Sequence, residues 1–237
     1  MCVEIYWALI IVLILTVVVH IFLFWASAFI NSGVYVKTYC RAKRADKCVA
    51  LTFDDSPSCR TGRVLDILKK HNVKATFFVI GSNIDEFPDV FKRIVDEGHV
   101  VGNHTWSHPP RFQTMKYINV ENEIKMTSDY IQSTIGKRPL FFRPPFGVTT
   151  PRIGRAVRKL GMSCIGWNIR SLDTVEKRTR EEIVERVIPQ IKPGSVILLH
   201  DRCKDSDRLL EMLFQYLDDN GYKVKTVEEM FNLKAYV

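Results

Sequence analysis

The stretch CVALTFDD (48–55) decides the fold, because it joins an uninterrupted apolar run to a pair of carboxylates. Such a run is typical of a strand that is buried on both faces of a parallel sheet. The two acids then lie at the carboxyl end of that strand. In a β/α protein the carboxyl ends of the strands gather on one face and carry the active site. Asp54 and Asp55 are therefore candidate site residues.

The same pattern recurs outward from this strand. Further strands are predicted at 75–80, 99–105, 140–145, 162–169, 194–201 and 222–227. Helices are predicted between them at 60–72, 88–98, 119–135, 150–161, 180–191 and 206–221, from apolar residues at helical spacing and from Pro or Gly at the ends. Strands that alternate with helices predict an α/β fold with a parallel sheet.

Residues 5–30 form an apolar segment without a formally charged side chain. A segment of this length can cross a bilayer with some tilt, and Trp7 and Trp25 suit the two interfaces. A cleaved signal peptide is the alternative, but no Lys or Arg precedes the run, and the run is longer than the apolar core of such peptides. We predict a transmembrane anchor over 1–37, a basic linker over 38–46 and one domain over 47–237.

The composition, 46% hydrophobic and 25% charged, is that of a globular protein. The net charge of +8 would allow nucleic acid, anionic lipid or an acidic polymer as a partner. The basic residues are spread along the chain except for one cluster directly after the apolar segment. This cluster consists of Lys37, Arg41, Lys43, Arg44 and Lys47. We expect a juxtamembrane role for it and no nucleic-acid partner, since zinc-finger spacings and RNA-binding aromatic motifs are absent from the sequence.

The same cluster bears on the side of the membrane that the domain occupies. Basic residues follow the apolar segment and none precedes it, which favours a cytoplasmic domain by the positive-inside rule. A cell-wall substrate would place the domain outside. The sequence therefore predicts a single-pass protein of the cell membrane and leaves the side open.

The segment HTWSH (104–108) follows the third predicted strand and holds two histidines four positions apart. Two imidazoles and one carboxylate make an open three-ligand site for a divalent metal, and Asp55 is the natural third ligand. Taken alone, the histidines are equally well explained as a surface or hydrogen-bonded pair. The neighbouring acids at 54–55 make the metal site the favoured interpretation.

Other strand ends supply groups for amide hydrolysis. A metal in this site would polarise a carbonyl and acidify a water, with Asp54 as the candidate base. His200 is the candidate acid for an amine leaving group, because histidine titrates near neutral pH. Arg143 precedes two prolines, and we expect its guanidinium to orient Asp54. The structural alternatives are a helix-capping Asp54, a core His200 and a surface ion pair of Arg143.

Two apolar residues are candidates for a sugar pocket. Trp167 is a candidate wall against a sugar ring, and Leu199 is a candidate for shaping the pocket of the acyl methyl group. Each could equally belong to the hydrophobic core.

Together these residues resemble the polysaccharide deacetylase family, the domain of chitooligosaccharide, peptidoglycan and chitin deacetylases. The resemblance covers residues 46–227, with its motifs in the family's order. They are TFDDS (52–56), HTWSH (104–108), RPPFG (143–147), WNIRSLD (167–173) and LLHD (198–201). Their joint occurrence is specific, although each short motif is not. The resemblance implies a distorted (β/α) barrel with about seven parallel strands.

The resemblance also implies a role for individual residues. It implies one divalent metal, zinc before cobalt, nickel or manganese, held by Asp55, His104 and His108. It implies Asp54 as base, His200 as acid, Arg143 as the partner of the base and Asp173 as the partner of the acid. The expected substrate-binding residues are Pro144, Phe146, Trp167 and Leu199.

Three positions depart from the family pattern. Ser56 stands where the family usually has Gly, Arg170 where Asp is frequent, and Thr174 where Trp is frequent. The altered fourth motif affects the substrate groove more than the metal site. We therefore expect an active enzyme.

Three functions are compatible with these residues. The leading hypothesis is hydrolysis of the N-acetyl group of a GlcNAc-containing glycan, such as peptidoglycan or a chitin-like oligosaccharide. The second is deacylation or deformylation of a lipid-linked amino sugar at the membrane. The third is a catalytically inactive, membrane-tethered module that binds glycans.

Overall fold

The structure, a computed structural model, describes residues 2–237 and contains one nine-stranded sheet. The strands are β1 (Thr38–Tyr39), β2 (Cys48–Ser56), β3 (Thr76–Val79), β4 (Val100–Asn103), β5 (Phe141–Phe142), β6 (Ser163–Ile165), β7 (Ile169–Arg170), β8 (Ser195–His200) and β9 (Lys223–Val224). Their order is β1-β6-β5-β4-β3-β2-β8-β7, with β9 also paired to β2. All these ladders are parallel. The predicted α/β class and parallel sheet are confirmed.

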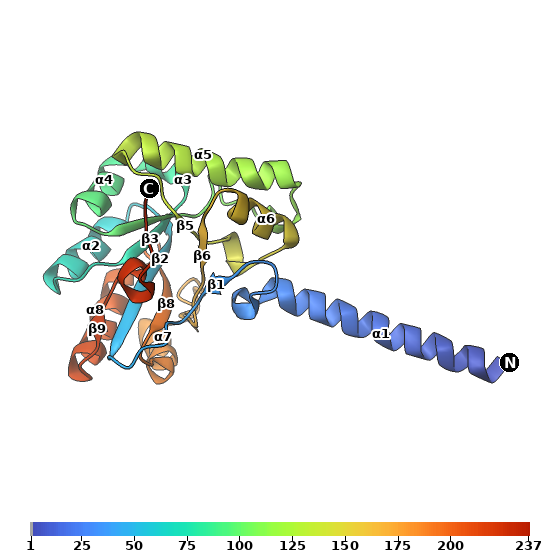
Figure 1. Cartoon of the computed structure of the whole chain (residues 1–237). Coiled ribbons are helices and arrows are strands. Elements are labelled where there is room, and N and C mark those ends of the chain that lie inside the picture. Colours follow the sequence, from blue (N-terminus) through green and yellow to red (C-terminus); the bar gives the residue numbers. More distant parts are fainter. Residues whose placement is uncertain (1) are drawn as a thin grey trace.

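Helices cover the sheet and separate most successive strands, apart from β1 and β2 and from β6 and β7 (Figure 1). They are α2 (Thr61–Lys70), α3 (Gly81–Glu86), α4 (Pro88–Asp96), α5 (Tyr117–Ile135), α6 (Pro151–Lys159), α7 (Arg180–Val187), α8 (Ser206–Asp219) and α9 (Val227–Phe231). Short 3-10 turns are η1 (Ile30–Ser32), η2 (Phe112–Thr114), η3 (Pro145–Gly147) and η4 (Ile188–Gln190). The sheet curves into a distorted barrel whose ladder path ends at β1 and β7 within residues 2–237.

Strand β2 lies inside the sheet and is buried along its whole length, which explains its continuous apolar sequence. Val49, Leu51 and Phe53 point into one hydrophobic core, whereas Cys48 and Ala50 point into another. This alternation follows from the two-residue period of a strand. The strand is thereby fixed from both faces, and its carboxyl end is held rigidly.

Two local features differ from the expected pattern. The predicted strand 162–169 divides into β6 and β7, and at Gly166 a Cβ atom would lie 2.5 Å from Cys40 Sγ. Gly81, directly after the predicted strand 75–80, begins the unpredicted helix α3, and a Cβ there would lie 2.4 Å from the Trp106 ring. In both places a glycine permits close packing that local sequence does not reveal.

Helix α1 (Cys2–Ala28) projects away from the rest of the molecule (Figure 1). Within Glu4–Ala28, an 18-residue window has a mean hydropathy of 2.9 and no buried residue, so the helix is long and apolar enough to cross a bilayer. A signal sequence near the amino terminus can meet the same criterion of length and composition. The carboxyl end of α1 is packed on the domain, because Ala26 is fully buried and Thr149 N donates to Ser27 O at 3.1 Å.

The segment predicted as a basic linker contributes to the sheet. Thr38 and Tyr39 form β1 and pair with β6, and Arg41 forms an isolated bridge with Ser195 of β8. The domain boundaries of 1–37, 38–46 and 47–237 stay predictions. Within the expected linker, however, residues 38–42 already belong to the fold, and Ala42 lies in a hydrophobic core.

Candidate active site

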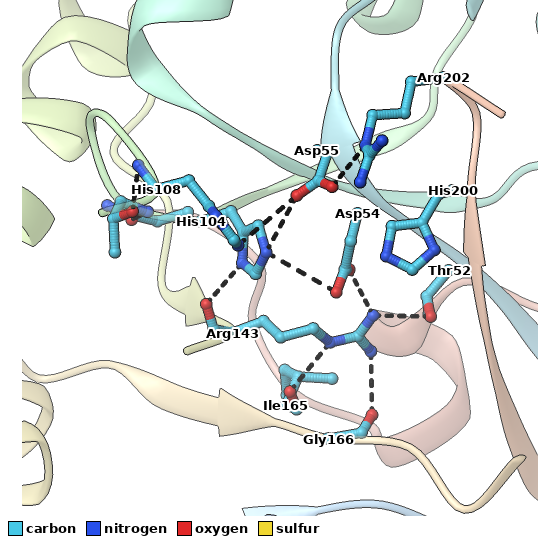
Figure 2. A network of polar contacts seen from close by, with 12 residues as sticks. Thr52, Asp54, Asp55, His104, His108, Arg143, Ile165, Gly166, His200 and Arg202 are labelled. Carbon is cyan, nitrogen blue, oxygen red and sulfur yellow. Dashed lines mark hydrogen bonds and ion pairs between the residues drawn. The ribbon is translucent and has the colours of Figure 1, made fainter. Parts of the chain in front are cut away.

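The strand ends bring the polar residues of distant motifs into one pocket of about 160 Å³. Asp54 and Asp55 come from the end of β2, His104 and His108 from the loop after β4, and His200 from the end of β8. Strands β4, β3, β2 and β8 are successive neighbours in the parallel sheet, so their carboxyl ends meet at the same edge. Figure 2 shows these side chains converging.

Asp55, His104 and His108 offer a possible metal site. Asp55 Oδ1 lies 3.5 Å from His104 Nε2 and 3.7 Å from His108 Nε2. One donor atom from each residue lies within 4.8 Å of the other two. Asp55 and His108 both have left-handed backbones, with φ of 65° and 46°. Such conformations cost free energy in non-glycine residues and are concentrated at functional sites.

The electrostatic state of this cluster fits a divalent cation. Asp55 Oδ1 is buried and has no hydrogen-bond partner among residues 2–237. Burial, followed by the charge of His104, lowers the pKa of His108 to about 4, which favours the neutral ring. Burial raises the pKa of Asp55, but the surrounding histidines and Arg202 outweigh it and the net pKa is lowered. Neutral imidazole and ionised carboxylate are the forms that bind metals.

The ring of His104 is oriented by the backbone. Its Nδ1 lies 2.7 Å from the carbonyl oxygen of Arg143, which can only accept a hydrogen bond. Nδ1 must therefore carry a proton, and Nε2 faces Asp55. This arrangement, in which a second contact fixes the tautomer, is common among metal-binding histidines.

Arg143 is fully buried behind the pocket and forms an ion pair with Asp54 (Figure 2). Its Nη1 donates to Asp54 Oδ1 at 2.7 Å and to Thr52 Oγ1 at 2.8 Å. The other guanidinium nitrogens donate to the carbonyl oxygens of Ile165 and Gly166 at 3.1 and 2.9 Å. A buried charge pair is tolerated only when its remaining polar groups are also satisfied. The network therefore fixes one orientation of the Asp54 carboxylate.

His200 pairs with Asp173 on the other side of the pocket. Its Nδ1 lies 2.8 Å from Asp173 Oδ1, and its backbone N–H donates to Asp173 Oδ2 at 2.6 Å. Burial lowers the pKa of His200, but the hydrogen bond that its ring donates to Asp173 and the charges of the nearby carboxylates outweigh burial, so that the net pKa is raised. The other ring nitrogen, Nε2, is therefore available in the pocket to donate a proton.

The comparisons with known proteins agree with this arrangement. The family model described as polysaccharide deacetylase matches residues 41–165.

The chain belongs to the polysaccharide deacetylase family.

Individual members of this family are similar to the chain over most of its length. The peptidoglycan-N-acetylglucosamine deacetylase PgdA of Listeria monocytogenes is 34% identical over 88% of this chain and 44% of its own length. The chain thus spans less than half of that relative. The solved structure of the Bc1960 peptidoglycan N-acetylglucosamine deacetylase superposes with a TM-score of 0.78 and 33% identity, over 83% of this chain and 93% of that one. It confirms the distorted barrel.

The family also contains members without activity. BA3943 from Bacillus anthracis, described as a CE4 family pseudoenzyme, is 29% identical with a TM-score of 0.75. The superposition includes 81% of this chain and 67% of the BA3943 chain. Membership in the family therefore indicates the fold and the class of site, whereas catalytic activity depends on the individual side chains in the pocket.

Trp167 and Phe146 line the pocket, but the two other expected substrate contacts, Pro144 and Leu199, do not. Leu198 lines the pocket, whereas Leu199 is packed in the hydrophobic core. The reason is strand alternation, because Leu198 shares the face of His200 and Leu199 faces the opposite side. Pro144 is buried just before η3 and is not part of the lining.

Arg202 is a site residue that the sequence analysis missed. Its Nε donates to Asp55 Oδ2 at 2.7 Å, and its side chain is half exposed at the pocket. Asp55 therefore has one oxygen held by Arg202 and the other free to face the histidines. The signal in the sequence was its position directly after LLHD (198–201), on the loop that leaves the end of β8.

The three departures from the family pattern have different surroundings. Ser56 is buried, and its hydroxyl donates to Asp201 Oδ2 at 2.7 Å, which ties the end of β2 to the loop after β8. Arg170 and Thr174 are exposed and line the mouth of the pocket.

Proposed function

We propose that the chain hydrolyses the N-acetyl group of an amino sugar in a GlcNAc-containing glycan, such as peptidoglycan or a chitin-like oligosaccharide. One observation carries the proposal: the buried Asp54 is held by Arg143 beside the Asp55, His104 and His108 cluster, and the Asp173-paired His200 lines the same pocket. The peptidoglycan deacetylases among the relatives support this substrate class.

The cluster of Asp55, His104 and His108 would hold one divalent ion, with zinc as the preferred metal. When bound, such an ion polarises an amide carbonyl and acidifies a water molecule. These donors are neutral or anionic in the forms that bind a cation. Cobalt, nickel and manganese accept the same set of nitrogen and oxygen donors.

The protein's own groups move the protons. Asp54, oriented by its ion pair with Arg143, accepts the proton of the attacking water. His200 is protonated more readily than a free histidine and gives its Nε2 proton to the departing amine. Asp173 accepts from Nδ1 throughout, so the ring keeps one orientation. This division gives the base and the acid separate residues on two sides of the pocket.

The walls of the pocket suit a sugar. Trp167 and Phe146 provide aromatic surface at one side, and Leu198 provides the apolar contact first assigned to Leu199. Aromatic faces pack against the apolar faces of sugar rings, while the rim offers polar groups for hydroxyls. These residues are proposed to bind the glycan.

Helix α1 is proposed to anchor the domain as a single membrane span, with the side of the membrane left open. Its apolar length supports a span, and its exposed aromatic residue Trp25 suits the interface. A basic cluster at 37–47 follows it and suits anionic headgroups.

The test is release of acetate from chitotetraose and from peptidoglycan fragments by the full chain in vesicles. We expect release that stops with a chelator and returns with added zinc. Sugar binding that persists without release in zinc, cobalt, nickel or manganese would instead identify an inactive glycan-binding module.

A further inference from the structure

Helix α6 lies beside the end of the anchor and exposes a row of cations (Figure 1). One side of the helix is buried in the core, and the other exposes Arg152, Arg155, Arg158 and Lys159. The three arginines recur at every third position, so they share one side of the helix. Arg158 Nη1 donates to the carbonyl oxygen of Tyr35 at 2.6 Å, which holds the helix against the segment that follows the anchor.

The partners that orient these arginines are uncharged. Arg152 Nη1 donates to the carbonyl oxygens of Thr114 and Met115 at 3.3 and 3.2 Å. The guanidinium of Arg155 lies 4.4 Å from the centre of the Tyr117 ring. Carbonyl oxygens and an aromatic ring hold a guanidinium in place without neutralising it. The arginines of α6 therefore present an oriented positive charge, which suits the oxygens of phosphate groups.

Acidic residues are absent from the parts of the sequence that meet around the end of the anchor. Three segments contain neither Asp nor Glu: 5–45, 98–120 and 130–172. The 26 acidic residues of the chain all lie elsewhere. Val36, Phe112 and Ile153, one from each segment, are buried in the same hydrophobic cluster, so the fold brings the three segments together. The surface around the anchor is thus positive over a wide area.

Exposed apolar side chains accompany these cations. Phe29 and Val34, directly after the anchor, are 51% and 44% exposed, and Ile118 at the start of α5 is 55% exposed. Arg111 and Lys116 are exposed beside Ile118. Figure 1 shows α6 and the start of α5 on the side of the domain from which α1 projects, with α2 and α4 on the opposite side. Cations interspersed with apolar groups are typical of surfaces that lie in a membrane interface.

We propose that this side of the domain rests on the headgroups of an anionic bilayer. The docking face consists of residues 29–37, residues 111–118 and the exposed side of α6. The proposed span of Glu4–Ala28 ends at the bilayer surface, and the end of α1 is packed on the domain, so the face is held close to the lipid. Each Lys or Arg is attracted to anionic lipid within a Debye length of about 8–10 Å.

A bilayer fits the docking face better than a soluble acidic polymer does. A polymer would pair with the cations but would leave Phe29 and Ile118 in water, whereas a membrane interface accommodates both kinds of side chain. The inference rests on the proposed membrane span and is independent of the proposed hydrolysis. It gives the domain one orientation on the membrane, set by α6 as well as by the anchor.

The experiment measures lysine reactivity of the full chain in two kinds of vesicle. One contains phosphatidylcholine alone, and the other is an equal mixture with phosphatidylglycerol. A water-soluble reagent acetylates exposed lysines, and peptide mass spectrometry gives the rate at each position. We expect acetylation of Lys116, on the docking face, to be about fivefold slower in the mixed vesicles. Lys92, exposed on α4, should react equally in both.

Charge variants test the part played by α6. In the double variant Arg152→Gln, Arg155→Gln, the slowing at Lys116 should fall to less than about twofold. The matched double variant Arg63→Gln, Lys69→Gln removes two exposed charges from α2 and should keep the slowing of the parent. High salt should abolish the slowing in the parent, because it screens the attraction between the arginines and the lipid.

The outcomes separate the docking face from the proposals on which it borders. Equal acetylation of Lys116 in both vesicles, with the chain resistant to extraction by alkaline carbonate, overturns the docking and leaves the span intact. Release of the chain by carbonate overturns the span and the docking with it. Slowing that persists in the α6 variant removes α6 from the docking face.

A last pair of measurements identifies the occupant and the activity. Slowing at Lys116 that soluble polyglutamate causes with phosphatidylcholine vesicles, and that phosphatidylglycerol does not cause, overturns the bilayer in favour of an acidic polymer. Acetate release from chitotetraose in the same vesicles reports on the hydrolysis separately, so its failure and the failure of the docking are distinguishable.

Discussion

The rear wall of the active site and its mouth are built in different ways. Asp54, His104 and Arg143 in the rear wall are 4%, 2% and 0% exposed, and each has a hydrogen-bond partner within the fold. Arg170 and Thr174 at the mouth are exposed. A buried charge that loses its partner is expensive, whereas an exposed one is solvated by water. The rear wall therefore fixes the chemistry, and the mouth can vary with the substrate.

The largest effect is expected for Asp54→Asn in the rear wall. The amide keeps the size of the side chain but cannot accept a proton as a base, so kcat should fall about 10²–10⁴-fold. Zinc affinity, measured by titration calorimetry, should stay close to the parent value. An Asp54→Asn protein that turns over as fast as the parent refutes the assignment of the base.

His104→Ala is expected to remove zinc binding together with activity. Loss of a contact that merely orients a ligand costs about 10–100-fold in affinity, and loss of the ligand itself should exceed that. Calorimetry and metal analysis after dialysis provide the measurement. Tight stoichiometric zinc in His104→Ala would show that the ion is held elsewhere.

Arg143→Met tests the rear wall through stability. It leaves Asp54 buried without its cation, so the free energy of unfolding should fall by about 3–5 kcal/mol in urea titrations. The matched change Arg138→Met removes an ion pair with the exposed Asp129 and should cost at most about 1 kcal/mol. Equal losses of unfolding free energy in the two variants would show that the ion pair in the rear wall contributes no more to stability than the one at the surface.

Asp173→Asn tests the acid through pH. In the parent, Asp173 helps to raise the pKa of His200 against the effect of burial. Without this carboxylate the pKa of His200 falls, so the ring loses its proton at a lower pH. The alkaline limb of the kcat profile should therefore move to lower pH, while Asp129→Asn leaves it in place. A shift in the opposite direction would argue against His200 as the acid.

The smallest effect is expected at the mouth. The double variant Arg170→Asp, Thr174→Trp restores residues that are frequent in the family. We expect KM for chitotetraose to change by less than about tenfold, since exposed contacts contribute modest free energies. Zinc affinity should be unchanged. A loss of zinc binding would mean that the mouth supports the metal site as well.

Much of the site was predictable because its residues follow strands. The apolar run of 48–55 predicted a buried strand, and parallel strands gather their carboxyl ends, so Asp54, Asp55 and His104 were expected together. Strand alternation also predicts that Leu198, rather than Leu199, lies on the same face of the strand as His200. Arg202 was overlooked because its loop conformation decides whether it turns back to Asp55.

The sequence by itself determined the parallel α/β fold, the family and the residue types of the site, because these depend on local periodicity and short motifs. Tertiary structure alone decided which atoms meet. Arg202, which follows Asp55 by 147 positions in the chain, binds one carboxylate oxygen of Asp55 and leaves the other free. Beside the active-site pocket, one cavity is lined by residues 28–31 together with Phe146 and Arg186, which are far apart in the sequence. Such contacts arise from how separate elements pack, and no local pattern encodes a distance between them.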